Sequence, residues 1–172
     1  FKLNLFNTYQ SNQSIALGDI GGGIGIINLA RSYRILQNNG VDKGLTFIDK
    51  IEDKSGKVLY QNYGYSSKVL QQEDCMLVND MLVSCAKTGT AKRLSDLPFD
   101  VASKTGTAQI NNKNTDLWNI VYTTEHLLLT WCGDGSSKGL EQNYSSSFYP
   151  TIINKRLLAS IYSNYSPAPF NL

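Results

Sequence analysis

The sequence has 172 residues, which is enough for one domain with its own hydrophobic core. Sixteen Lys and Arg residues against fourteen acidic ones give a net charge of +2, which excludes a strongly cationic nucleic-acid-binding protein and an acidic tail protein. No stretch approaches the ~18 apolar residues of a membrane-spanning helix. The chain opens with Phe1 rather than Met and shows no signal peptide, so we expect a segment of a longer protein.

Few residues have the chemistry of a metal site or a catalytic triad. Cys75, Cys85 and Cys132 form no Cys-x-x-Cys pair, and their odd number argues against a fully paired disulfide framework. We expect them to be buried, unreactive thiols. The single histidine, His126, begins an apolar run and is expected to pack or to lie in a loop rather than to catalyse. The sequence predicts neither a metal nor a cofactor.

The spacing of apolar residues predicts three helices, over residues 24–38, 71–86 and 146–163. Asn38-Asn39-Gly40 ends the first helix, and Gly89 ends the second.

The remaining ordered segments have the pattern of strands. Residues 45–61 have the pattern of a β-hairpin, with Asp53-Lys54-Ser55-Gly56 as the turn. Three further strands are expected at 99–108, 117–123 and 126–132. Because short turns connect these three strands, they must be antiparallel neighbours. The expected fold class is therefore α+β.

A glycine cluster at residues 21–25 precedes the first helix and suggests a phosphate-binding loop. The cluster fails the pattern GxGxxG because residue 26 is Ile, and GxxxxGK[ST] is absent from the sequence. We interpret it as a tight turn that leads into the helix.

The pentapeptide Lys-Thr-Gly-Thr-Ala occurs twice, at residues 87–91 and 104–108. The first copy follows a helical pattern, so its Gly89 is interpreted as a helix stop. The second copy follows residues 98–103, which have the pattern of a short strand. We predict that only the second copy lies on a strand.

Several segments match one protein family in the same order along the chain. They are Ala16-Leu17-Gly18, residues 29–33 and 38–40, the hairpin at 51–60, Gly89-Thr90-Ala91, the strand at 101–108, and the strands around Asp116-Leu117-Trp118, Tyr122-Thr123 and 129–133. This series resembles the transpeptidase domain of penicillin-binding proteins, the serine acyltransferases that cross-link peptidoglycan. The Asp-x-Trp strand and the Gly-ended strand after it are most similar to the bifunctional, glycosyltransferase-bearing class A branch. Asn119 and Val121 stand where the family has Phe and Gly, so we expect different packing there.

The resemblance implies the C-terminal part of a single transpeptidase domain with the α+β fold of penicillin-binding proteins and β-lactamases. Residues 1–98 would give helices and the hairpin, and residues 99–172 the active-site strand, the other antiparallel strands and a closing helix. It also implies a place at the extracytoplasmic face of a bacterial membrane, with the anchor in the missing N-terminal part.

The family's chemistry needs a Ser-x-x-Lys motif that carries the nucleophile, a Ser-x-Asn motif and a Lys-Thr-Gly strand. Ser84 to Lys87 is the single Ser-x-x-Lys match, but it ends a predicted helix only twenty residues before Lys104. No Ser is followed by Asn two residues later. We therefore expect the nucleophile to be missing and the chain alone to be inactive.

The resemblance gives roles to four residues of the second pentapeptide. Lys104 would supply positive potential, the hydroxyls of Thr105 and Thr107 would bind a terminal carboxylate, and Gly106 would leave room for the acyl group. The backbone N–H of Thr107 would be an oxyanion donor. An extended peptide could lie along this strand's edge. The alternative is an ordinary edge strand with a solvated lysine. Three nearby residues are expected to be scaffold: Asp116, Trp118 and Trp131.

Three functions stay open. The chain could be part of a serine-type D-Ala-D-Ala transpeptidase that penicillins acylate, a non-catalytic module that only binds stem peptide, or a relative that hydrolyses or senses β-lactams. The implied partners are stem peptides, β-lactams and the rest of the same enzyme. Nucleic acid is not an expected partner. Apolar surface that the rest of the enzyme would cover favours self-association of the isolated piece.

Overall fold

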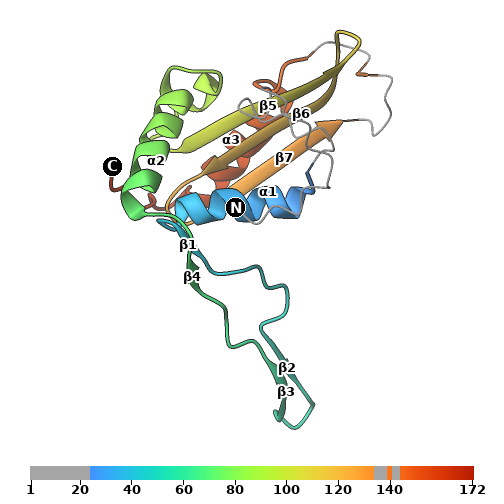
Figure 1. The fold of residues 1–172 in the computed structure, drawn as a ribbon, viewed down its shortest axis with the longest axis vertical. Helices are drawn as coiled ribbons and strands as arrows, with labels where there is room; N and C mark the ends of the chain where they lie inside the picture. Colours follow the sequence, from blue (N-terminus) through green and yellow to red (C-terminus); the bar gives the residue numbers. More distant parts are fainter. Residues whose placement is uncertain (1–23, 134–138, 141–143) are drawn as a thin grey trace.

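The structure is a computed structural model that describes residues 24–133, 139–140 and 144–172. Its central element is an antiparallel sheet of three strands in the order β5-β6-β7 (Figure 1). These are β5 (Ala102–Ile110), β6 (Lys113–Tyr122) and β7 (Leu127–Gly133). All three predicted strands are confirmed, although β5 begins three residues later and β6 four residues earlier than expected. Asn111 and Asn112, with φ of 50° and 61°, form the tight turn that lets β5 and β6 continue so far.

Helices cover both faces of this sheet, which confirms the α+β class. Side chains alternate along a strand, so Val121 and Tyr122 of β6 point to opposite faces. Val121 packs in a cluster with Leu158 of α3 (Tyr149–Ile161). Tyr122 packs in another cluster beside Leu36 of α1 (Ile26–Gln37). Figure 1 accordingly shows α1 in front of the sheet and α3 behind it.

The third helix, α2 (Gln72–Lys87), lies beside β5. Ala86 of α2 belongs to the cluster on the α3 face, and Leu82 and Val83 belong to the cluster on the α1 face. A short 3-10 helix, η2 (Lys92–Leu94), follows α2 and packs against α3. The three predicted helices are confirmed in type and place. Of the helices in the described ranges, none has the length and hydropathy needed to cross a membrane.

Between α1 and α2 the chain leaves the sheet as a long arm (Figure 1). At its base β1 (Val41–Asp42) pairs with β4 (Ser67–Lys68), and further out β2 (Lys50–Glu52) pairs with β3 (Val58–Gln61). The outer pair confirms the predicted hairpin. The Asp53 carboxylate stabilises its turn by accepting hydrogen bonds from the backbone N–H groups of residues 55 and 57, at 2.8 and 3.0 Å. The pairing of β1 with β4 was not predicted, because two-residue strands have no measurable period.

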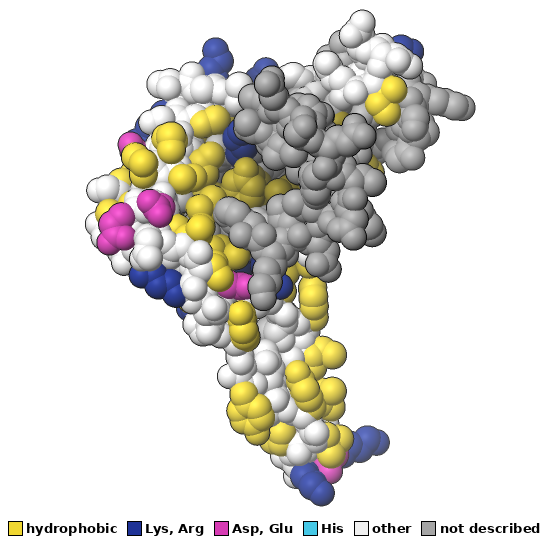
Figure 2. Space-filling view, in the orientation of Figure 1, with side chains coloured by type: hydrophobic (Ala, Val, Ile, Leu, Met, Phe, Trp, Pro, Cys, Tyr) yellow, Lys and Arg dark blue, Asp and Glu magenta, His cyan; other side chains and the backbone are white. Residues whose placement is uncertain are grey.

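Exposed apolar side chains gather on this arm (Figure 2). Phe47 and Tyr63 are 82% and 93% exposed. Between β1 and β4, the other large apolar residues with more than two fifths of their surface exposed are Ile48, Ile51, Val58, Leu59, Tyr60 and Tyr65. A surface of this kind is typical of an interaction site or an aggregation-prone segment. Exposed apolar surface was expected from the resemblance, but its position on the arm was not predicted.

A buried carboxylate joins the base of the arm to α1. Arg31 donates from Nε and Nη2 to the two carboxylate oxygens of Asp42, at 3.1 and 2.5 Å. The backbone N–H of Gly44 also donates to Asp42, at 2.9 Å. The hydrogen bonds from Arg31, and to a lesser degree the one from Gly44, hold the pKa of Asp42 below its ordinary value.

Replacing Asp42 with Asn should lower the free energy of unfolding at pH 7 by about 1–3 kcal/mol. Because the folded pKa is depressed, this stabilisation is present above the unfolded Asp pKa of ~3.9 and is lost as the pH falls through the folded pKa. In urea unfolding from pH 7 to pH 2, the free energy of unfolding should therefore fall less steeply below pH ~4 for the variant than for the wild type. Asp49→Asn is the control, since no side-chain hydrogen bond of Asp49 is found among the described residues. Identical pH profiles for wild type and Asp42→Asn would contradict this.

The predictions for cysteine and histidine have mixed outcomes. Cys75 is buried as expected, but Cys85 and Cys132 are only partly buried, because each lies at the rim of the packed region; all three are free. Burial raises the pKa of the Cys75 and Cys132 thiols. The packing role of His126 is confirmed, since its Nδ1 lies 2.8 Å from the Tyr162 hydroxyl and the two rings are in edge contact. The glycine cluster up to residue 23 and the matching segment 16–18 lie outside the described residues.

Candidate active-site strand

The strand β5 is an edge strand over the part of the chain that the structure describes. It pairs with β6, in a register that sets Lys104 opposite Ile120 and Gly106 opposite Trp118, and it has no second strand neighbour there. The second Lys-Thr-Gly-Thr-Ala copy thus lies on a strand, as predicted. Its outer backbone groups have no β-ladder partner, which is the arrangement that binds an extended peptide.

The first copy ends α2 and forms the turn after it, so its interpretation as a helix stop is also confirmed. The N–H of Gly89 donates to the Cys85 carbonyl at 3.0 Å. A Cβ at residue 89 would lie 2.9 Å from both Cα and O of Cys85, closer than real Cβ contacts. Only glycine fits this close approach of the turn to the helix.

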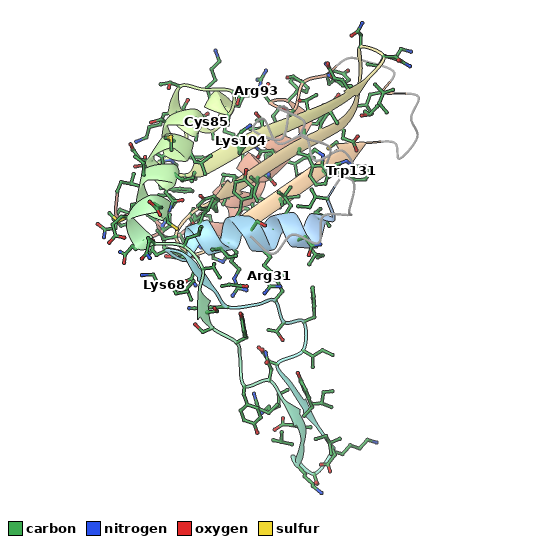
Figure 3. The ribbon with its side chains drawn as sticks, in the orientation of Figure 1. Arg31, Lys68, Cys85, Arg93, Lys104 and Trp131 are labelled. Carbon is green, nitrogen blue, oxygen red and sulfur yellow. The ribbon has the colours of Figure 1, made fainter. Side chains whose placement is uncertain are left out.

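Lys104 and Gly106 share the face of the sheet that α1 covers in part. The Lys104 side chain is exposed near the end of α2 (Figure 3), and its Nζ donates to the carbonyl oxygen of Thr105 at 2.6 Å. A Cβ at residue 106 would lie 3.4 Å from Cβ of Trp118. Gly106 therefore adds no side chain to the surface next to Lys104, and its cross-strand neighbour on the same face is Trp118.

Thr105 points to the other face and is buried, with 6% of its surface exposed. Its hydroxyl lies 2.8 Å from the hydroxyl of Thr90, which in turn lies 3.6 Å from Sγ of Cys85. Thr90 belongs to the first pentapeptide copy, so the two copies contact each other. This contact was not predicted, because neither local pattern shows that two residues fifteen positions apart will meet.

Thr107 is exposed and donates its hydroxyl to Oγ of Ser146 at 2.9 Å. Both hydroxyls predicted to bind a carboxylate therefore have a protein partner in this structure. Each hydroxyl has one donor hydrogen and two acceptor lone pairs. A carboxylate that binds the Thr107 hydroxyl would thus replace Ser146 as the acceptor. A carboxylate that accepts from the Thr105 hydroxyl would require Thr90 to be the donor in the Thr90–Thr105 hydrogen bond.

A buried polar network supports β5 from the α3 face. Asn119, directly opposite Thr105, is fully buried and donates from Nδ2 to Oγ of Ser103 at 3.0 Å. Asn154 of α3 donates to Oδ1 of Asn119 at 2.8 Å. The departure from the family's Phe at residue 119 thus gives polar rather than apolar packing.

The three residues expected to be scaffold contact one another on the face of the sheet that α1 covers in part. The Trp118 and Trp131 rings lie 6.1 Å apart, and Nε1 of Trp131 donates to Oδ1 of Asp116 at 2.8 Å. These contacts tie β6 to β7, which supports the scaffold interpretation. Across the described segments, no group of three or more His, Cys, Asp and Glu residues is placed to hold a metal ion.

The family model for the penicillin binding protein transpeptidase domain matches residues 5–127. The chain belongs to this family. Penicillin-binding protein 1A of Clostridium acetobutylicum is 34% identical to it over 138 residues, which are 78% of this chain and 16% of the relative. Penicillin-binding protein 1A of Aquifex aeolicus is 31% identical over 134 residues, again 78% of this chain and 18% of the relative. These transpeptidase-family relatives confirm the resemblance to the class A branch, and the chain spans about a sixth of their length.

Solved structures confirm the fold of this transpeptidase-family chain. PonA1 from Mycobacterium tuberculosis in complex with penicillin V aligns with a TM-score of 0.80 at 23% identity, over 92% of this chain and 43% of that one. Penicillin-binding protein 1A from Haemophilus influenzae aligns with a TM-score of 0.76 at 18% identity, over 95% of this chain and 30% of that one.

Proposed function

We propose that this chain is the C-terminal part of a single serine-type D,D-transpeptidase domain that cross-links peptidoglycan stem peptides and is acylated by penicillins. Residues 1–98 would supply the helices and the arm, and residues 99–172 the active-site strand with its support. The observation that carries the proposal is the edge position of β5, with Lys104, Thr105 and Gly106 on it in a chain of this family.

Four residues of the strand have a defined role in this proposal. The peptide lies along the outer edge of β5 and hydrogen-bonds to its backbone. Lys104 attracts the terminal carboxylate, and the hydroxyls of Thr105 and Thr107 bind it. Gly106 allows the acyl group to approach the strand, and the N–H of Thr107 is one of the oxyanion donors. The Thr90 hydroxyl lies 2.8 Å from that of Thr105, and with Thr90 as the donor of their hydrogen bond the Thr105 hydrogen is free for the ligand.

The partners follow from the same proposal. PonA1, one of the structures with this fold, is in complex with penicillin V, which favours β-lactams as ligands here. The rest of the parent enzyme would supply the nucleophile and the membrane anchor, with the domain at the extracytoplasmic face.

Binding of a diacylated tripeptide ending in D-Ala-D-Ala tests this proposal on the full chain. Backbone NMR shifts should change at residues 102–108 on titration, and the same peptide ending in L-Ala-L-Ala should bind much more weakly. Lys104→Gln should weaken binding by about tenfold, the effect of losing one charged hydrogen bond. Lys54→Gln, which removes an equal charge on the arm, is the control. Equal binding of the two peptides, or shifts confined to other elements, would contradict the proposal.

A second candidate is a non-catalytic module that only binds stem peptide. It is favoured by the placement of Ser84, which is exposed in the last turn of α2. The parent reading frame upstream of Phe1 separates the candidates, because Ser-x-x-Lys and Ser-x-Asn motifs there would exclude this one.

A further inference from the structure

A groove with a volume of about 510 Å³ lies between η2 and α3, apart from the β5 edge. Its walls contain four basic residues and one acidic residue. The lining residues are Lys92, Arg93, Ser95, Asp96, Ile152, Lys155, Arg156 and Ala159. The proposed function uses none of them.

The charge of this groove is unusual for the chain. Its four cations and one carboxylate give a local charge of +3, whereas the whole chain has a net charge of +2. Asp96 is already engaged, since Lys155 donates to its Oδ2 at 2.6 Å. The helix α3 contains no acidic residue. Among the described residues, Lys92, Arg93 and Arg156 therefore have no ion-pair partner, and a concave surface concentrates their potential.

The walls of the groove are held in place by packing beneath them. Leu94 of η2 and Leu158 of α3 are buried in the same hydrophobic cluster. The Arg93 guanidinium carbon lies over the Phe148 ring, 5.1 Å from its centroid, and Phe148 directly precedes α3. This contact positions the guanidinium beside the groove, where its N–H groups can donate to a ligand. The backbone from which the cations extend is thus held by the core, and the Phe148 contact additionally positions the Arg93 side chain.

We propose that this groove binds an anion that carries two or more phosphate groups. Three cations without an acidic partner match a ligand with several negative charges, and a single carboxylate would leave most of them uncompensated. Two of the three are arginines, whose planar N–H forks bind phosphate oxygens in pairs. Soluble polyphosphates and clustered phospholipid headgroups share this chemistry.

Calorimetric titration of the full chain with sodium tripolyphosphate tests the site. Saturable binding with one site per chain is expected, and it should weaken as salt rises from 50 to 300 mM because the cations are exposed to screening. The double variant Lys92→Gln/Arg156→Gln should lose at least about tenfold in affinity, since it removes two of the three unpaired cations. The control Lys54→Gln/Lys57→Gln removes the same charge from the arm and should lose less than about twofold. All four residues are exposed, so unchanged urea midpoints should show that each variant is folded.

Two further arms define the ligand class. Citrate, a polyanion without phosphate, should bind at least about tenfold more weakly than tripolyphosphate. Sedimentation of the chain with vesicles of phosphatidic acid in phosphatidylcholine shows whether lipid headgroups occupy the same groove. Loss of vesicle binding in the double groove variant would identify lipid headgroups as ligands. Binding of tripolyphosphate without binding of vesicles would identify a soluble anion as the ligand. Absence of saturable tripolyphosphate binding at millimolar concentration would overturn the proposal. Equal losses in the groove and control variants, or citrate binding as tight as tripolyphosphate, would also overturn it.

Discussion

Replacing Asn154 with Ala is expected to lower the free energy of unfolding by about 3–5 kcal/mol, the largest effect of any single polar substitution that we predict. Asn154 is fully buried at the contact between α3 and the sheet. Its Nδ2 donates to both the backbone oxygen and Oδ1 of Asn119, at 3.0 and 2.8 Å. Its Oδ1 accepts from the Thr130 hydroxyl at 2.6 Å. One side chain thus connects α3 to β6 and β7.

The size of this effect follows from the groups that the substitution leaves behind. Alanine at 154 would remove the hydrogen-bond partner of Oδ1 of the buried Asn119 and of the hydroxyl of the half-buried Thr130. Each buried polar group without a hydrogen bond costs about 1–3 kcal/mol. Asn119 also donates to Ser103 of β5, so loss of its anchor at Asn154 should loosen the strand that carries Lys104.

Urea unfolding at pH 7 measures this loss directly. Asn164→Ala is the matched control, because Asn164 is exposed in the turn after α3 and its substitution should change stability by less than about 0.5 kcal/mol. Asn154→Asp is a second variant that keeps the shape of the side chain but removes the Nδ2 donor, and it should also be strongly destabilised. A loss below about 1 kcal/mol in Asn154→Ala would contradict the importance of the network.

The second large effect is an absence of reaction: the chain alone should not be labelled covalently by a fluorescent penicillin. Acylation needs a serine that an adjacent base activates. The single Ser-x-x-Lys match fails this requirement in the structure. Ser84 is exposed in the last turn of α2, and Lys87 is paired instead with Asp100, its Nζ lying 2.8 Å from Oδ1 of that residue. This lysine is directed to a surface carboxylate and not held as a base for Ser84.

Gel fluorescence after incubation with the labelled penicillin, with penicillin-binding protein 1A of Clostridium acetobutylicum as a positive control, measures this outcome. The wild-type chain and Ser84→Ala should both give background signal. Labelling that disappears in Ser84→Ala would identify Ser84 as the nucleophile. Labelling that persists in this variant would place the nucleophile at another residue of the chain, and either result would contradict our prediction.

Local sequence patterns determined most elements of this protein, but not η2 or the short strands β1 and β4. The period of apolar residues located all three helices and the sheet strands, because burial of one face of a helix or strand imposes that period on the sequence. Context also separated the two Lys-Thr-Gly-Thr-Ala copies: a helical run before Gly89 and a strand-like run before Lys104 predicted their different structures. The order of the motifs further determined the family, which the match over residues 5–127 confirms.

Only the tertiary structure decided how these elements meet. The Thr90–Thr105 contact, the network of Asn154 with Asn119, and the Lys155–Asp96 pair join residues 15, 35 and 59 positions apart. No local period encodes such contacts, because they depend on how whole helices and strands pack. The same reason applies to the basic groove, whose cations come from η2 and α3. The sequence therefore determined which strand carries Lys104 and its neighbours, and the packing of α2 and α3 decided what holds that strand in place.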